Sequence, residues 1–290
     1  MAVAPRSKPL IRVPSSDGID VALHELAGDD VLPTLLISHA TGFHAHCYEA
    51  IAASLADRFH SVGLDYRGHG ATDLDPGWAT DWSRFGDDAL AAARRLAVPI
   101  VGFGHSMGGA ALLMAAHREP TLFERLVLFE PIAHPAAPAG ASEQEIDANP
   151  MVQGALRRRR TFASFEAAYD NYRAKPPMSV MTPPVLRNYV EYGFRPTVDA
   201  DGAPAVTLRC APEVEAGIFA TARNNGVWGL LTEIETPCVV IAGRVETSEP
   251  SFQTRSIAER LPHAQYVQLD HQTHFGPFSH PTEVAELIAA

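Results

Sequence analysis

The chain has 290 residues, of which 46% are hydrophobic and 20% charged, and 23 Lys and Arg against 34 Asp and Glu give it a net charge of −11. This acidic balance argues against nucleic acid or an anionic membrane as the main partner. No apolar run approaches the roughly 18 residues of a membrane span. Three cysteines without C-x-x-C spacing indicate neither a disulfide framework nor a zinc site. Residues 1–10 contain no apolar secretory core, so the expected compartment is the cytoplasm.

Short apolar runs that predict strands alternate with stretches of helical spacing along most of the chain. In chain order, strands are predicted at residues 19–25, 34–39, 61–65, 100–103, 125–129, 238–242 and 265–269. Helices are predicted at residues 48–59, 81–96, 110–118, 252–261 and from 282 onward. Apolar strands that alternate with helices predict an α/β fold, in which a mostly parallel central sheet is flanked by helices on both faces.

This alternation stops between Pro131 and Pro237, in a segment that is rich in proline and has helical spacing around residues 149–172. A structureless loop of that length is improbable inside a compact domain. We therefore predict three parts of the chain. They are a first part of the α/β core at 1–130, a helical cap or lid at 131–236 and a second part of the core at 237–290.

The strongest chemical signal is the sequence Gly-His-Ser-Met-Gly at residues 104–108, which is a G-x-S-x-G pattern. A predicted strand precedes it and a helix of small residues follows it, which is the context that holds a serine hydroxyl on a sharp strand-to-helix turn. A dinucleotide-binding loop would need a third glycine at position 107, where the chain has Met107. The remaining alternative is a glycine-rich turn with a capping serine. The flanking elements favour Ser106 as a nucleophile.

A serine hydroxyl needs a base to become a good nucleophile. Among the thirteen histidines, His274 follows the last predicted strand by a short loop near the C-terminus. His271, three residues earlier, is the lesser candidate. A nucleophile followed by an acid and then a histidine is the chain order of α/β-hydrolases.

In these motifs and in their order along the chain, the sequence resembles the α/β-hydrolase fold superfamily, and specifically its capped serine hydrolases of the esterase and lactonase kind. The matching segments are SHATGF (38–43), DYRGHG (65–70), GHSMGG (104–109), LVLFEP (126–131) and HFGPFSHP (274–281). The resemblance implies that Ser106 is the nucleophile and His274 the general base. It also implies an oxyanion hole made of the backbone N–H groups of Met107 and Thr41, and no need for a cofactor or metal.

The sequence departs from this family at residues 39–41, where His-Ala-Thr replaces the usual His-Gly-x. The resemblance gives scaffold roles to four polar residues near the predicted strand ends, which are His39, Asp65, Arg67 and His69.

Two glutamates compete for the acid that orients His274. Glu130 directly follows the predicted strand 125–129, which is where a subset of the superfamily takes its acid. Glu246 follows the strand 238–242 in a polar loop that continues through residues 247–250, where many members carry an aspartate. Because an acid that must hold an imidazole is better placed on a rigid element, we favour Glu130 and keep Glu246 as the alternative.

Arg157–Arg160 is a run of four arginines in the predicted cap, and we interpret it as a solvated face. Its functional alternative is attraction of an anionic substrate.

We therefore expect a serine hydrolase that cleaves a small, apolar carboxylic ester or lactone. A first alternative is hydrolysis of a carbon–carbon bond in a diketone from aromatic degradation, which usually requires a positive group for a substrate carboxylate. A second is a non-catalytic protein that uses the same fold to bind a small ligand. The cap carries no motif that names the substrate, and the oligomeric state stays open, with a homodimer as one possibility.

Overall fold

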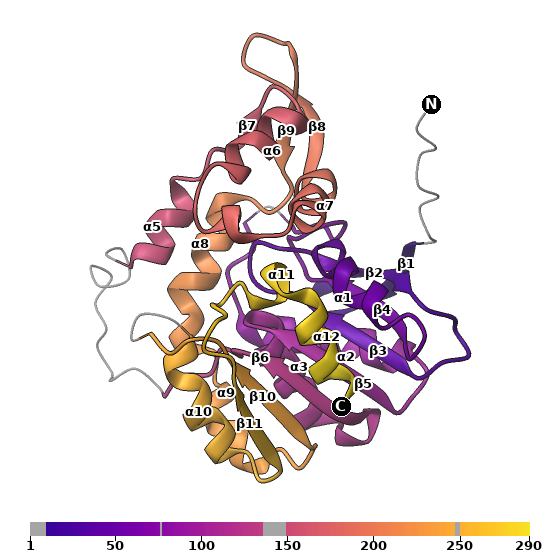
Figure 1. The fold of residues 1–290 in the computed structure, drawn as a ribbon. Helices are drawn as coiled ribbons and strands as arrows, with labels where there is room; N and C mark the ends of the chain where they lie inside the picture. Colours follow the sequence, from indigo (N-terminus) through magenta and orange to yellow (C-terminus); the bar gives the residue numbers. More distant parts are fainter. Residues whose placement is uncertain (1–9, 76, 136–148, 247–249) are drawn as a thin grey trace.

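The computed structural model describes residues 10–75, 77–135, 149–246 and 250–290. Its main sheet has the order β1-β2-β4-β3-β5-β6-β10-β11 (Figure 1). These strands are β1 (Leu10–Pro14), β2 (Asp20–Ala27), β3 (Thr34–Ser38), β4 (His60–Asp65), β5 (Ile100–His105), β6 (Phe123–Phe129), β10 (Cys238–Ala242) and β11 (Ala264–Gln268). From β4 to β11 all neighbouring strands are parallel. At the other edge, β1 pairs antiparallel with β2, and β2 pairs antiparallel with β4. The predicted α/β-hydrolase fold class is confirmed. The edge strand β1 has no counterpart among the strands predicted from the sequence.

Helices cover both faces of this sheet, as the apolar strands require. The helices against the sheet and at its ends are α1 (Glu49–Ser54), α2 (Trp82–Arg95), α3 (Met107–Arg118), α9 (Val227–Leu230), α10 (Ser251–Arg260), α11 (Gly276–Ser279) and α12 (Pro281–Ala289). Successive side chains of β3 point to opposite faces. Leu36 belongs to the apolar cluster under α2 and α3, and Leu35 and Ile37 belong to the cluster under α1 and α12. The strand is therefore buried from both sides.

The segment between β6 and β10 adds helices and a small second sheet. Its helices are α5 (Pro150–Leu156), α6 (Phe165–Arg173), α7 (Pro183–Gly193) and α8 (Pro212–Thr221). Its antiparallel strands, in the order β7-β9-β8, are β7 (Thr161–Phe162), β8 (Phe194–Val198) and β9 (Pro204–Leu208). Figure 1 shows this part standing above the main sheet, with α8 leading back to it. The sequence pattern predicts helices here but not the small sheet, and the single helical stretch predicted around residues 149–172 is two helices separated by β7.

Short 3₁₀ helices complete the described part of the chain. They lie at Ser16–Gly18, Ala45–Tyr48, Pro120–Leu122, Met178–Val180, Ala222–Asn224 and Leu231–Glu233. Within the described ranges, no helix combines the length and the apolar character that crossing a membrane requires.

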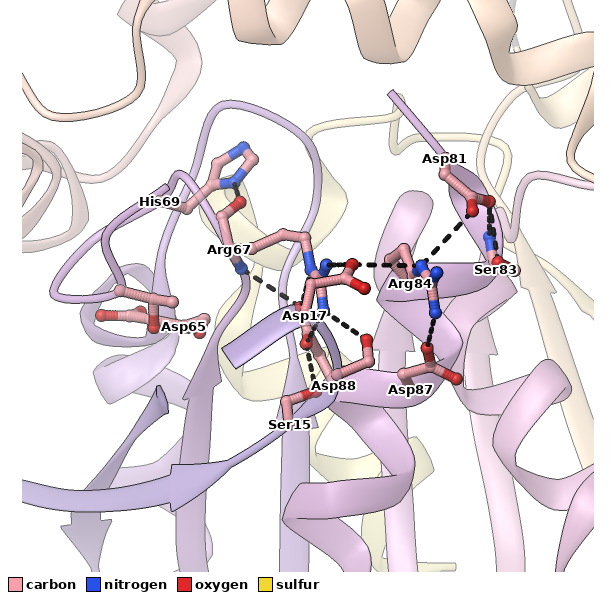
Figure 2. Close-up of polar contacts among 12 residues, drawn as sticks. Ser15, Asp17, Asp65, Arg67, His69, Asp81, Ser83, Arg84, Asp87 and Asp88 are labelled. Carbon is pink, nitrogen blue, oxygen red and sulfur yellow. Dashed lines mark hydrogen bonds and ion pairs between the residues drawn. The ribbon is translucent and has the colours of Figure 1, made fainter. Parts of the chain in front are cut away.

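The loop that follows β4 is held by a buried ion pair (Figure 2). The Arg67 guanidinium donates to both carboxylate oxygens of Asp88 in α2, at 2.9 and 2.7 Å, and to Asp17 at 3.0 Å. The Arg67 and Asp88 side chains are fully buried. A buried bidentate pair fixes the loop, because neither charge can move without losing its partner in a low-dielectric environment. This arrangement is consistent with the scaffold role expected for Arg67.

We expect Asp88→Asn to lower the free energy of unfolding by about 3–5 kcal/mol, because it leaves the Arg67 charge buried with only partial compensation. Urea denaturation followed by circular dichroism measures the effect. The matched control is Asp170→Asn, which removes an exposed ion pair with Arg173 and should change stability by less than about 0.5 kcal/mol. Equal effects of the two substitutions would contradict a structural role for the buried pair.

Candidate active site

Ser106 lies on a sharp turn between β5 and α3. Its backbone has φ 55° and ψ −115°, a strained conformation for a residue other than glycine. The turn is anchored to the end of β6, because Ser106 N–H donates to Phe129 O at 3.0 Å and Ile132 N–H donates to Ser106 O at 3.2 Å. A β-carbon on Gly104 would lie 2.6 Å from Gly109 Cα, so the helix can follow the strand this closely only without a side chain there.

The buried carboxyl group of Glu130, at the end of β6, pairs with the partly exposed His274. Glu130 Oε2 lies 2.6 Å from His274 Nδ1, and the carboxyl group is completely buried. Its other oxygen, Oε1, accepts the backbone N–H of Gly243 at 2.7 Å. A carboxylate is only an acceptor, so His274 donates from Nδ1 and its Nε2 carries the lone pair. This is the tautomer that a general base needs.

His274 is held beside the residue that precedes Ser106. His105 Nε2 lies 3.0 Å from the backbone oxygen of His274, and the centroids of the two imidazole rings are 4.8 Å apart. Ser106 is 7% exposed, and within the described residues no hydrogen bond joins its hydroxyl to His274. The structure therefore brings the imidazole to the nucleophile turn. Catalytic hydrogen bonds are often long in unliganded enzymes.

Glu246, the alternative acid, lies elsewhere. Its carboxylate accepts two hydrogen bonds from the Arg244 guanidinium, at 2.9 and 2.6 Å, and its side chain is 45% exposed. Residues 247–249 of the same polar loop lie outside the described residues. Glu130, and not Glu246, is the glutamate that contacts His274.

The two expected oxyanion donors are on adjacent elements. Met107 is the first residue of α3, so its N–H has no carbonyl partner within the helix. Thr41 follows β3, whose last residue Ser38 donates its hydroxyl to Gly108 O at 2.9 Å and so ties the strand end to α3. A β-carbon on Gly108 would lie 2.2 Å from Ser38 O. Within the described residues, the N–H groups of Met107 and Thr41 donate to no protein acceptor.

Histidines buried beneath this loop keep it in place. His69 Nε2 accepts the N–H of Gly42 at 3.0 Å, and His39 Nε2 accepts the N–H of Tyr66 at 3.0 Å. Burial lowers the pKa of His69, and burial together with the nearby His69 lowers the pKa of His39 to about 3. Both rings therefore stay neutral and can accept these bonds at physiological pH. His39 and His69 have the contacts of scaffold residues.

The Arg158 guanidinium, in a side chain that is 17% exposed, also lies against this loop. Arg158 forms an ion pair with Glu215 and donates to the hydroxyls of Tyr189 and Tyr172, the latter at 3.3 Å. A β-carbon on Gly42 would lie 2.6 Å from Glu215 Oε1 and 3.4 Å from Arg158 Nη1. The prediction that the arginine run is a solvated face is therefore wrong for Arg158, because long-range contacts with α6, α7 and α8 take most of its side chain out of solvent.

Two residues without a predicted role lie close to the site. Tyr48 is completely buried and its hydroxyl oxygen lies 2.8 Å from Nδ1 of His105, which is 1% exposed. His105 is adjacent to Ser106 in sequence, so its place at the turn follows from the G-x-S-x-G motif. Tyr48 lies 57 residues earlier in the chain, and no sequence signal connects the two. Among the described residues there is no cluster of His, Cys, Asp and Glu side chains able to hold a metal ion.

A nucleophile turn after β5, an acid–histidine pair at the ends of later strands and a covering insertion define an α/β-hydrolase. A model of the alpha/beta hydrolase family matches residues 35–287, and the chain belongs to that family. Mouse monoglyceride lipase is 31% identical over 118 residues, which are 39% of this chain and 39% of the lipase. The match therefore spans well under half the length of that relative.

Two further proteins match over almost the whole chain. The pimeloyl-acyl-carrier-protein methyl ester esterase of Chromobacterium violaceum is 25% identical over 270 residues, covering 89% of this chain and 93% of the esterase. The crystal structure of the enol-lactonase from Burkholderia xenovorans superposes with a TM-score of 0.69 at 18% identity, over 97% of this chain and 98% of the lactonase. The similarity to the lactonase shows a shared fold and nothing more.

Proposed function

We propose that this α/β-hydrolase is a serine hydrolase that cleaves a carboxylic ester or lactone through an acyl-enzyme intermediate. The observation that carries the proposal is the contact between the buried Glu130 carboxyl and His274, with 2.6 Å between Oε2 and Nδ1, held next to the strained turn that presents Ser106. A nucleophile, a base and an acid that orients the base are the parts that acyl transfer requires.

In the proposed reaction, the Ser106 hydroxyl oxygen attacks the carbonyl carbon while His274 Nε2 takes its proton. Glu130 stabilises the imidazolium that forms. The N–H groups of Met107 and Thr41 hold the negative oxygen of the tetrahedral intermediate, each contributing on the order of 10²–10³ in rate if it acts like a measured donor. His274 then protonates the leaving alcohol. Water, deprotonated by the same imidazole, cleaves the acyl-enzyme and regenerates Ser106.

The surroundings of the site support a small substrate of low polarity. Phe43, in the loop after Thr41, packs against Phe275 with 5.9 Å between ring centroids and against Tyr189 of α7 at 5.4 Å. Aromatic rings at the contact between cap and core offer an apolar wall to an acyl chain. Arg158, the cation beside this loop, is already paired with the Glu215 carboxylate. That pairing favours a neutral ester or lactone over a diketone acid that needs a free positive group.

The first test is labelling with a serine-directed fluorophosphonate, together with a substrate panel. We expect wild-type protein to be labelled at Ser106 and to hydrolyse at least one member of a set of p-nitrophenyl esters and lactones faster than a vinylogous diketone. Labelled-peptide mass spectrometry and initial rates measure the two outcomes. A folded wild-type protein that is neither labelled nor active on the panel would favour a ligand-binding role, and preferred cleavage of the diketone would favour the carbon–carbon hydrolase.

A further inference from the structure

A line of hydrogen bonds through two buried side chains runs from the oxyanion loop to the backbone of His274. Ala40 N–H donates to the Tyr48 hydroxyl oxygen at 3.1 Å. The same hydroxyl lies 2.8 Å from His105 Nδ1, and His105 Nε2 lies 3.0 Å from His274 O. Tyr48 is 0% exposed and His105 is 1% exposed, so water does not compete for these groups.

The chemistry of the groups determines the direction of every bond. The backbone oxygen of His274 can only accept, so His105 must carry its proton on Nε2. Burial lowers the pKa of His105 well below its ordinary value, so the ring is neutral and Nδ1 has a free lone pair. The Tyr48 hydroxyl must therefore donate to Nδ1. Burial raises the pKa of Tyr48, which keeps that hydroxyl protonated. The remaining lone pair of the Tyr48 oxygen accepts from Ala40.

This line connects the three elements whose relative placement decides the proposed reaction. Ala40 precedes Thr41, His105 precedes Ser106, and the last bond ends on His274 itself. Phe278 packs against the rings of both Tyr48 and His105, with centroid distances of 5.2 and 5.3 Å, and holds them from the side. A displacement of one element therefore breaks a hydrogen bond that has no alternative partner in the buried interior.

We propose that Tyr48 and His105 are positioning residues that set the distance between the oxyanion donor, the nucleophile and the base. The proposal rests on the function proposed above and assigns neither side chain a contact with substrate. The expected consequence of losing either side chain is a lower kcat, because misplacement of the reacting groups by about 1 Å can cost on the order of 100-fold in rate. In the function proposed above, the cap and the aromatic rings around Phe43 bind the substrate, and neither loss removes them, so we expect KM to change much less than kcat.

We expect Tyr48→Phe to lower kcat on the best ester by roughly 10- to 100-fold while KM changes by less than about threefold. The affinity for a trifluoromethyl ketone, whose adduct with Ser106 carries an oxyanion, should fall by a similar factor. The control is Thr254→Val, which also removes a buried hydroxyl, one that donates to Pro250 O at 3.1 Å in α10, away from this line and from the oxyanion loop. If Tyr48→Phe lowers kcat no more than Thr254→Val does, the positioning role is wrong.

Two substitutions of His105 test the other end of the line. His105→Gln keeps an amide donor for the His274 carbonyl, whereas His105→Leu has none, so the glutamine variant should retain about tenfold more kcat at a similar melting temperature. Equal kcat for the two would overturn the role of the bond to His274.

A measurement on the wild-type protein covers the case in which a variant does not fold. Nitrogen NMR of imidazole-labelled protein should show His105 as the neutral Nε2–H tautomer from pH 5 to pH 8, and an Nδ1–H tautomer or a cation would overturn the proposal. Ser106→Ala, assayed alongside, separates the two ideas. If Ser106→Ala loses turnover while Tyr48→Phe keeps full turnover, only the positioning role is overturned. If Ser106→Ala keeps its turnover, the proposed hydrolase mechanism is overturned as well.

Discussion

Replacing Ser106 by alanine is expected to lower kcat by about 10⁵- to 10⁶-fold on any ester that the wild-type protein hydrolyses, because nucleophile removal in a triad of this kind costs that much. The alanine side chain meets no new contact, and the backbone at this turn is equally strained for serine and alanine. Steady-state kinetics with circular dichroism for folding measures the effect. Residual activity above about 1% of wild type, in protein shown to be free of wild-type contamination, would mean that Ser106 does not form the acyl-enzyme.

A second buried serine provides the control for Ser106. Ser61 in β4 is 0% exposed, and its hydroxyl has no hydrogen-bond partner among the described residues. Ser61→Ala also removes one hydroxyl oxygen from the protein interior, but it leaves the residues of the candidate active site unchanged. We expect kcat to stay within about twofold of wild type and stability to be unchanged or slightly higher, because an unsatisfied buried hydroxyl is lost.

Replacing Glu130 by glutamine is expected to lower kcat by about 10⁴-fold, the loss seen when the acid of such a triad becomes an amide. Glutamine has nearly the same volume and its oxygen can still accept from Gly243 N–H. Its amide group, however, is a donor, and a donor facing His274 Nδ1 moves the imidazole proton to Nε2. The lone pair that must accept the Ser106 proton is then lost.

Glu246→Gln is the matched comparison for this prediction. Glu246 pairs with Arg244 in a half-exposed loop, and such pairs contribute little. We expect kcat within about threefold of wild type. Both variants are assayed for kcat and KM on the same ester after urea denaturation has shown that each is folded. The opposite ranking, with Glu246→Gln more impaired, would give the role of the acid to Glu246.

Local sequence was enough to predict the strands that carry the site. The strand predicted at residues 238–242 has the bounds of β10, and the strand predicted at residues 100–103 lies within β5. Buried parallel strands read as continuous apolar runs, and this pattern does not depend on distant partners. The position of Glu130 at the end of such a strand also follows from local sequence. The same local sequence favours Glu130 over Glu246, which lies in a polar loop, as the acid for His274.

The insertion was less predictable, because its small sheet has weak local signals. β7 has two residues, and β8 is short and contains Pro196, a residue that usually argues against a strand. Both strands form because β9 lies between them and supplies hydrogen-bond partners. The burial of Arg158 has a similar origin. Its partner Glu215 is 57 residues away in sequence, so a run of arginines alone resembles a solvated surface.

Hydrophobic periodicity and the G-x-S-x-G motif are local properties, so the amino-acid sequence is sufficient to predict the α/β-hydrolase core, the nucleophile turn at Ser106 and the two candidate acids for His274. The contact of Glu130 with His274 and the contact of Tyr48 with His105 are visible only in the folded chain. Those contacts link residues that are 144 and 57 positions apart. Residues so far apart in the sequence are brought together by the packing of the whole sheet. A pattern among neighbouring residues therefore cannot predict these contacts.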